Sequence, residues 1–144
     1  MKKIFLASTM ALALVSGSAM AVCSSGAGWK KANNGGTGGN PDITAVLSGN
    51  TVCVGSAPTW TAQEYHQSGG TLIDWKRGPS APGNIDPTEA VGSWSIVGDQ
   101  VQYIYTSGGS YTFDVYVNAP NYSFCTGTSS AADATVKTGQ SACP

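Results

Sequence analysis

Residues 58–78 hold side chains that could bind a small molecule. This stretch, PTWTAQEYHQSGGTLIDWKRG, contains the chain's only histidine and two of its four tryptophans. A tryptophan ring packs on the apolar part of a ligand, while a carboxylate, an imidazole or a guanidinium fixes its polar end. The candidate ligand-binding residues are therefore Trp60, Glu64, His66, Trp75 and Arg77.

The same stretch has the pattern of a β-hairpin. Two runs rich in aromatic and β-branched residues flank Gly69-Gly70, and such a pair supplies the positive φ angles of a two-residue turn. With that turn, His66 faces Ile73 across the hairpin. Since side chains alternate along a strand, the two faces of the hairpin are expected to carry different sets of side chains. The predicted binding face contains Trp60, Ala62, Glu64, His66, Ile73, Trp75 and Arg77, with Leu72 and Asp74 on the opposite face.

An internal cluster is the alternative interpretation, in which Glu64 and Arg77 pair with each other as diagonal neighbours. The sequence contains no Gly-x-Ser-x-Gly, Walker or His-Glu-x-x-His motif. Glu64 and His66 supply only two of the ligands that a metal site needs. In the expected register Asp74 lies away from Glu64, so the hairpin offers no carboxylate pair for glycoside chemistry. We therefore expect no enzyme activity, no metal and no cofactor.

The N-terminus, MKKIFLASTMALALVSGSAMA, is typical of a secretory signal peptide covering residues 1–21. Two lysines precede an apolar run that is too short to span a membrane, and a small-residue A-x-A site follows. The short Lys-Lys start indicates a Gram-negative bacterium, and hence the periplasm or the extracellular space. The formal net charge of −1 leaves no basic surface for nucleic acid.

Four cysteines follow the signal peptide, and in an oxidising compartment this even number predicts two disulfides. Three pairings are possible. We favour Cys53–Cys125 with Cys23–Cys143, which would tie the two ends of the exported chain together. The local alternative is Cys23–Cys53 with Cys125–Cys143.

Composition divides the exported chain into an arm and a domain. Residues 22–41 are rich in Gly, Ser and Asn and are expected to form a flexible arm. Residues 42–144 are then a single disulfide-bonded domain. Strand patterns separated by turn residues recur at residues 50–54, 92–97, 101–106, 111–118 and 122–126. Together with the hairpin they predict an all-β, antiparallel up-and-down meander of about seven or eight strands. It would close into a small barrel or, alternatively, form a two-layer β-sandwich.

The loop at residues 98–100 decides which side chains face inward in the second half of the chain. A three-residue loop unites Trp94, Ile96, Ile104, Phe113, Val115 and Val117 on one apolar face. Tyr103, Tyr105 and Tyr116 then lie together on the opposite face. Clustered tyrosines are common in contact surfaces, although they also cover half-exposed sheets.

The segments GTLIDWKRGP, IDPTEAVGSWSI and GSYTFDVYVNAPNYSFC resemble a group of uncharacterised exported bacterial proteins. In outline the meander is also similar to small lipocalin-like barrels, and the likeness covers about residues 50–125. Gly92-Ser93-Trp94 is similar to the Gly-x-Trp signature of lipocalins, although here it lies in the middle of the domain. The resemblance implies an up-and-down barrel able to hold one small molecule.

These observations predict an exported, non-enzymatic protein that binds a small molecule or an extended polymer on the inner face of the 58–78 hairpin. The alternative is a structural or adhesive surface protein. Such a protein would form homo-oligomers through the face with Tyr103, Tyr105 and Tyr116, or through an exposed strand edge.

Overall fold

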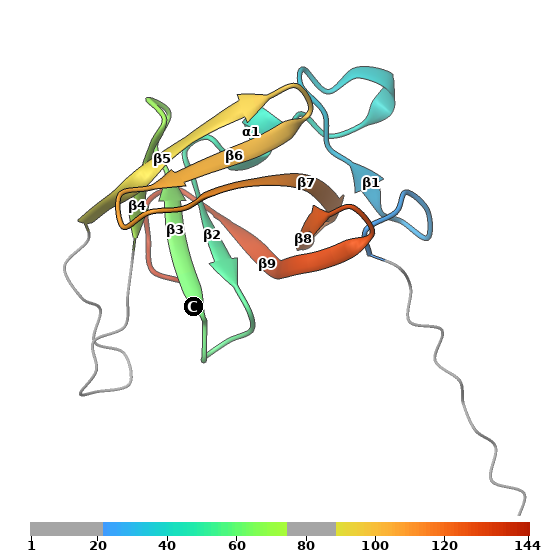
Figure 1. Ribbon diagram of the computed structural model, residues 1–144. Coiled ribbons are helices and arrows are strands. Elements are labelled where there is room, and N and C mark those ends of the chain that lie inside the picture. Colours follow the sequence, from blue (N-terminus) through green and yellow to red (C-terminus); the bar gives the residue numbers. More distant parts are fainter. Residues whose placement is uncertain (1–21, 75–88) are drawn as a thin grey trace, which may run out of the picture.

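The computed structural model describes residues 22–74 and 89–144, which form an all-β domain with one short α-helix, α1 (Ile43–Leu47), and a 3₁₀ turn, η1 (Thr37–Gly39) (Figure 1). The strands are β1 (Lys30–Lys31), β2 (Asn50–Val54), β3 (Ala62–His66), β4 (Thr71–Asp74), β5 (Glu89–Val97), β6 (Gln100–Tyr105), β7 (Ser110–Asn118), β8 (Asn121–Thr126) and β9 (Ser129–Thr138).

Strands β2 to β9 form a closed antiparallel barrel of eight strands. Each pairs with its neighbour in sequence, and β2 pairs with β9 to close the sheet. The additional strand β1 pairs with the second half of β7, beyond the part that pairs with β6. The predicted all-β meander and small lipocalin-like barrel are confirmed, and the two-layer sandwich is not formed.

The hairpin of β3 and β4 has a register one residue away from the predicted one. His66 pairs with Leu72 and Glu64 pairs with Asp74, so the loop has three residues instead of two. Gly70 ends the loop with a φ of 89°, as three-residue hairpin loops require. Leu72 and Asp74 therefore share the interior face with Glu64 and His66, and the predicted placement of Ile73 on that face is wrong.

The turn between β5 and β6 is also one residue different from our prediction. Val97 pairs with Gln100, leaving a two-residue turn that begins at Gly98 with a φ of 61°. Trp94 consequently pairs with Tyr103, which is 4% exposed, while Ile104 is 49% exposed. The predicted apolar face is thus wrong at Ile104, because a slip of one residue reverses every side chain of a strand.

Helix α1 covers one end of the barrel and contributes two fully buried side chains, Ile43 and Leu47, to the core. Its N-cap is Asp42, whose carboxylate accepts a hydrogen bond of 2.9 Å from the backbone N–H of Thr44. The core continues into the barrel through Leu72, Trp94, Val101 and Val115. This end of the barrel is therefore filled by side chains.

The two disulfides attach the flanking segments to the outside of the barrel. Cys23 pairs with Cys125 of β8, and Cys53 of β2 pairs with Cys143. Two disulfides were expected, but both of the pairings that we considered are wrong. Strand β9 lies between β2 and β8, which separates Cys53 from Cys125. Each of these strand cysteines instead meets a segment that crosses its outer face.

Residues 22–41 pack on the barrel, in contrast to the flexible arm expected from their composition. Ala32 is fully buried and donates a backbone hydrogen bond of 2.8 Å to Val115. The side chain of Asn33 accepts from the N–H of Thr37 and donates to its carbonyl, which organises the glycine-rich turn. The Cys23–Cys125 disulfide anchors the start of the segment. Local hydrogen bonds and one covalent link thus offset the flexibility of the glycines.

Candidate ligand-binding pocket

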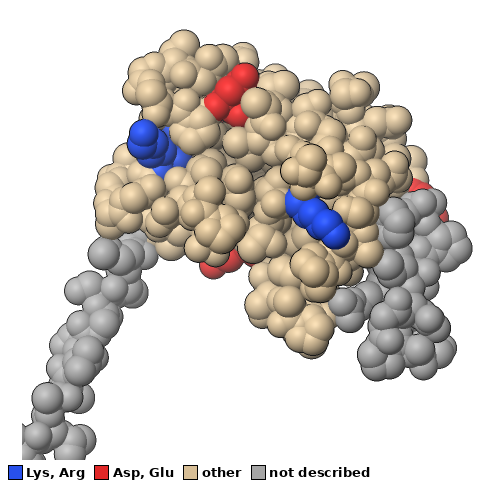
Figure 2. Space-filling view, turned by 180° about the vertical axis from the view of Figure 1, so that it is seen from behind, with Lys and Arg blue, Asp and Glu red and all other residues tan. Residues whose placement is uncertain are grey.

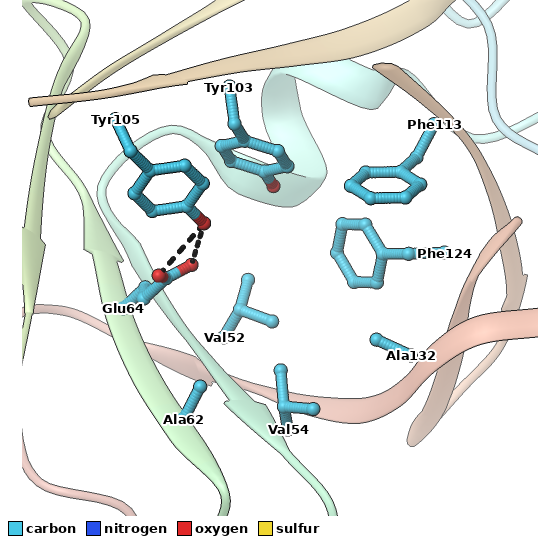
Figure 3. Close-up of a pocket in the computed structure, with 9 residues that line it drawn as sticks. All are labelled: Val52, Val54, Ala62, Glu64, Tyr103, Tyr105, Phe113, Phe124 and Ala132. Carbon is cyan, nitrogen blue, oxygen red and sulfur yellow. Dashed lines mark hydrogen bonds between the residues drawn. The ribbon is translucent and has the colours of Figure 1, made fainter. Parts of the chain in front are cut away.

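The barrel interior contains a pocket of about 210 Å³ at the end away from α1 (Figure 3). Strands β2, β3, β6, β7, β8 and β9 each direct at least one side chain into it, because alternate residues of a barrel strand face inward. The lining residues are Val52, Val54, Ala62, Glu64, Tyr103, Tyr105, Phe113, Phe124 and Ala132. Among the described residues the wall is thus aromatic and aliphatic, with the carboxylate of Glu64.

Glu64 is held in the pocket wall by Tyr105. The phenol O–H of Tyr105 donates to both carboxylate oxygens, at 3.0 and 3.2 Å (Figure 3). Burial raises the pKa of Glu64 to about 7; the Tyr105 hydrogen bond opposes this rise, and the charge of Asp74 adds to it. Burial, and then the nearby Glu64 charge, raises the pKa of Tyr105, which therefore remains a proton donor. Near neutral pH the site offers a carboxylate that can gain or lose a proton.

A second carboxylate, Asp74, lies directly opposite Glu64 on β4 and is 9% exposed. The expectation that Asp74 would point away from Glu64 is wrong, because the hairpin register differs by one residue. Asp74 is not among the residues that line the pocket, so a bound molecule would meet Glu64. Two carboxylates therefore face inward on neighbouring strands of this side of the barrel.

The lysines of the described chain lie outside the barrel. Lys31 forms an ion pair of 2.8 Å with Asp114, and Lys30 and Lys137 donate to backbone carbonyls near the two ends of the chain. Figure 2 shows that charged side chains on one face of the molecule are few and well separated. The described lysines thus all lie outside the barrel, where several acidic side chains, including Asp99 and Asp114, lie as well.

His66 is fully buried and uses both ring nitrogens within the protein. Its Nδ1 lies 3.1 Å from the backbone carbonyl of Glu64, and its Nε2 lies 2.7 Å from the hydroxyl of Tyr103. A carbonyl can only accept, so Nδ1 carries the proton and Nε2 accepts from Tyr103. Burial lowers the pKa of His66 to about 4, and the ring packs edge-on against Trp94. His66 is therefore a neutral residue of the core, outside the pocket wall.

The described members of the predicted ligand-binding set, Trp60, Glu64 and His66, do not form one site. Glu64 lines the pocket, and His66 lies two residues further along β3 in the core. Trp60 precedes β3 and donates a 2.7 Å hydrogen bond to the carbonyl of Pro144 at the chain's end. Trp75 and Arg77 lie outside the described residues. Of the three described members of the set, Glu64 is the one that lines the pocket.

The three predicted interface tyrosines do not share a face. Tyr103 and Tyr105 point into the barrel, whereas Tyr116 is buried outside it against the Cys23–Cys125 disulfide and Trp29. Tyr103 and Tyr105 are therefore pocket residues that were not among the predicted binding residues. Reading Gly98-Asp99 as a two-residue turn would have placed both on the interior face.

An aromatic row connects the buried part of the pocket to its rim. The ring centroids of Tyr103 and Tyr105 are 6.3 Å apart, and Tyr105 and Tyr111 are 6.0 Å apart. Tyr111 also stacks on Phe113 at 6.4 Å, and it is 52% exposed. The row therefore offers a continuous aromatic surface from solvent to the interior, as an entrance for an apolar molecule would.

Comparison with protein-family models, curated proteins and solved structures found no match to this chain. Within residues 22–74 and 89–144 no three His, Cys, Asp or Glu side chains lie close enough together to hold a metal ion. No helix in that part of the chain is long and apolar enough to cross a membrane. The function of the pocket must therefore be argued from its shape and chemistry.

Proposed function

We propose that this protein is an exported, non-enzymatic binding protein that holds one small, mainly apolar molecule inside its barrel. The observation that carries the proposal is the pocket of about 210 Å³, whose described lining consists of aromatic and aliphatic side chains and the carboxylate of Glu64. Protein interiors are normally packed densely, and empty apolar space costs stability. A ligand would fill that space and recover the lost contacts.

The size of the pocket limits the ligand. An apolar cavity of about 150 Å³ is large enough for benzene. A pocket of about 210 Å³ therefore suits a molecule with one ring and a short side chain, or a short aliphatic chain of similar volume. A polymer could place no more than one terminal group or side group there.

Export is part of the proposal for two reasons. The first 21 residues have the sequence pattern of a secretory signal peptide. All four cysteines are paired in disulfides, which persist in oxidising compartments. The alternative, self-association through a tyrosine face, gains no support from the positions of Tyr103, Tyr105 and Tyr116, because they lie on different sides of the barrel wall.

The test uses a pocket-filling variant with a matched control. Ala132 lines the pocket, while its neighbour Ala131 is exposed. Phenethyl alcohol is titrated into the disulfide-bonded protein by calorimetry, and its contacts are mapped by NMR. We expect binding that Ala132→Phe weakens at least about tenfold, since the added ring fills the pocket, and that Ala131→Phe leaves unchanged.

Circular dichroism of both variants checks that they fold. No binding to the wild-type protein would overturn the proposal. So would unchanged binding to a folded Ala132→Phe variant, because the ligand would then lie elsewhere.

A further inference from the structure

The Glu64 carboxylate in the pocket wall can select among small apolar molecules by their polar end. Glu64 lies in the pocket wall, and Asp74 lies opposite it on the neighbouring strand. The three described lysines are on the outside, where Lys31 is already paired with Asp114. We propose that the pocket takes a small primary amine with an apolar body, with Glu64 as the partner of its ammonium group. This inference rests on the proposed function and names its ligand class.

Glu64 has hydrogen-bonding capacity left for such a group. Tyr105 supplies one O–H, which the two carboxylate oxygens share. An ionised carboxylate can accept about four hydrogen bonds, and an ammonium group has three donors to give. In Figure 3 the carboxylate and the Tyr105 hydroxyl meet at the edge of the open space. A ligand ammonium group placed there would meet the Glu64 carboxylate, to which Tyr105 is the one described side chain seen to donate a hydrogen bond.

The aromatic walls favour the same kind of ligand. Phe113 and Phe124 meet edge to face, with ring centroids 6.3 Å apart, and Tyr103 lies 6.1 Å from Phe113. The faces of aromatic rings attract cations and also pack on apolar groups. They would therefore hold both parts of a protonated amine. A carboxylate or phosphate ligand would instead bring a second negative charge beside the ionised Glu64 carboxylate.

Binding should also depend on the protonation of Glu64. Among the described residues, the groups near it are Asp74 from β4, Tyr103 and Tyr105 from β6, and His66 from its own strand. His66 stays neutral above pH about 4 and both tyrosines keep their protons, so Glu64 itself is the group expected to change near neutral pH. An ammonium ligand prefers ionised Glu64. Its affinity should therefore rise as pH increases from about 6 to 8, through the Glu64 pKa of about 7.

The experiment compares three probes that share a benzyl group and differ in their polar end: phenethylamine, phenethyl alcohol and phenylacetate. Calorimetry at pH 8 on the disulfide-bonded protein should rank the amine at least about tenfold tighter than the alcohol. Phenylacetate should bind most weakly. Glu64→Gln should remove the preference for the amine while keeping the alcohol. Asp99→Asn, which removes a carboxylate from the β5–β6 turn outside the pocket, should leave the preference unchanged.

Two results would overturn the inference and leave the proposed function standing. One is equal binding of amine and alcohol to the wild-type protein, and the other is an amine preference that survives Glu64→Gln. Binding of the alcohol in both proteins would show that the pocket still takes apolar molecules. If none of the three probes binds, the inference and the proposed function both fail.

Discussion

Strand β3 contributes a polar side chain to each end of the barrel interior, and the two ends differ in how tightly they are packed. At the closed end, formed around Leu47, Leu72 and His66, every one of these side chains is fully buried. At the pocket end, formed around Glu64 and Tyr105, open space remains. Glu64 and His66 of β3 both face inward, yet His66 has partners at both nitrogens and Glu64 keeps acceptor capacity. Burial of a polar side chain therefore indicates a site only where its hydrogen bonds are incomplete.

The two ends should differ most in how much truncating a side chain lowers the free energy of unfolding. Leu47→Ala removes a fully buried side chain of α1 at the closed end and should lower the free energy of unfolding by about 2–5 kcal/mol. Val54→Ala, in the wall of the existing pocket, should cost about 1 kcal/mol or less, since its contacts are already incomplete. Urea unfolding followed by tryptophan fluorescence measures both. Equal losses would mean that the two ends are packed alike.

A smaller contrast lies in how the two ends respond to pH. His66 has a lowered pKa, so below pH about 6.5 the unfolded chain binds a proton that the folded protein does not. This makes stability fall as pH decreases from about 6.5 to 4. Glu64 has a raised pKa, so the folded protein binds the extra proton between pH about 4.5 and 7, and stability falls as pH increases. The two effects oppose each other in the wild-type protein.

Single substitutions should separate these effects. Glu64→Gln removes the Glu64 effect and keeps the His66 effect. Lowering the pH from 6.5 to 4 should therefore reduce the free energy of unfolding by up to about 3 kcal/mol more than in the wild type. His66→Gln removes the His66 effect and keeps the Glu64 effect. Lowering the pH from 7 to 4.5 should therefore raise the free energy of unfolding by up to about 3 kcal/mol relative to the wild type. Urea unfolding across this pH range gives both differences. Parallel pH profiles in the three proteins would contradict the assignment.

The smallest effects should come from two hydroxyl deletions. Tyr103→Phe leaves the buried Nε2 of His66 without its donor and should cost about 1–2 kcal/mol. Tyr105→Phe should cost less than about 1 kcal/mol, because the Glu64 carboxylate borders open space. It should also raise the pKa of Glu64 further, since Tyr105 stabilises the ionised form. NMR titration of the Glu64 carboxyl carbon measures that shift, and a fall in this pKa would refute the role given to Tyr105.

The general fold followed from the sequence because strand length, alternation and turn residues all indicated one meander. The strand registers did not follow from the sequence, because the glycine-rich turns allow more than one loop length. Ser68-Gly69-Gly70 and Gly98-Asp99 can each close a hairpin with two or three loop residues. One residue of difference moved Asp74 to the interior and Ile104 to the surface.

Glu64 was predicted correctly to face inward with His66, since residues two apart on one strand share a face whatever the register. Their different surroundings depend on α1 and on Tyr103 and Tyr105, which are distant in sequence. The disulfide pairing likewise depends on the order of strands around the barrel, which the spacing of cysteines does not encode. Sequence patterns therefore could not predict which residues distant in the chain lie next to each other in the barrel.

The closing contact between β2 and β9 has a consequence for how the chain folds. Every other pairing of neighbouring barrel strands joins segments that are consecutive in sequence, whereas this one joins the first barrel strand to the last. Contacts between distant segments form late, because the loop between them must be ordered first. Hairpins such as β5–β6 should thus appear early, and the β2–β9 contact should form last and separate first. A circular permutant that connects β9 to β2 and opens the β5–β6 hairpin should therefore form the β5–β6 contact last.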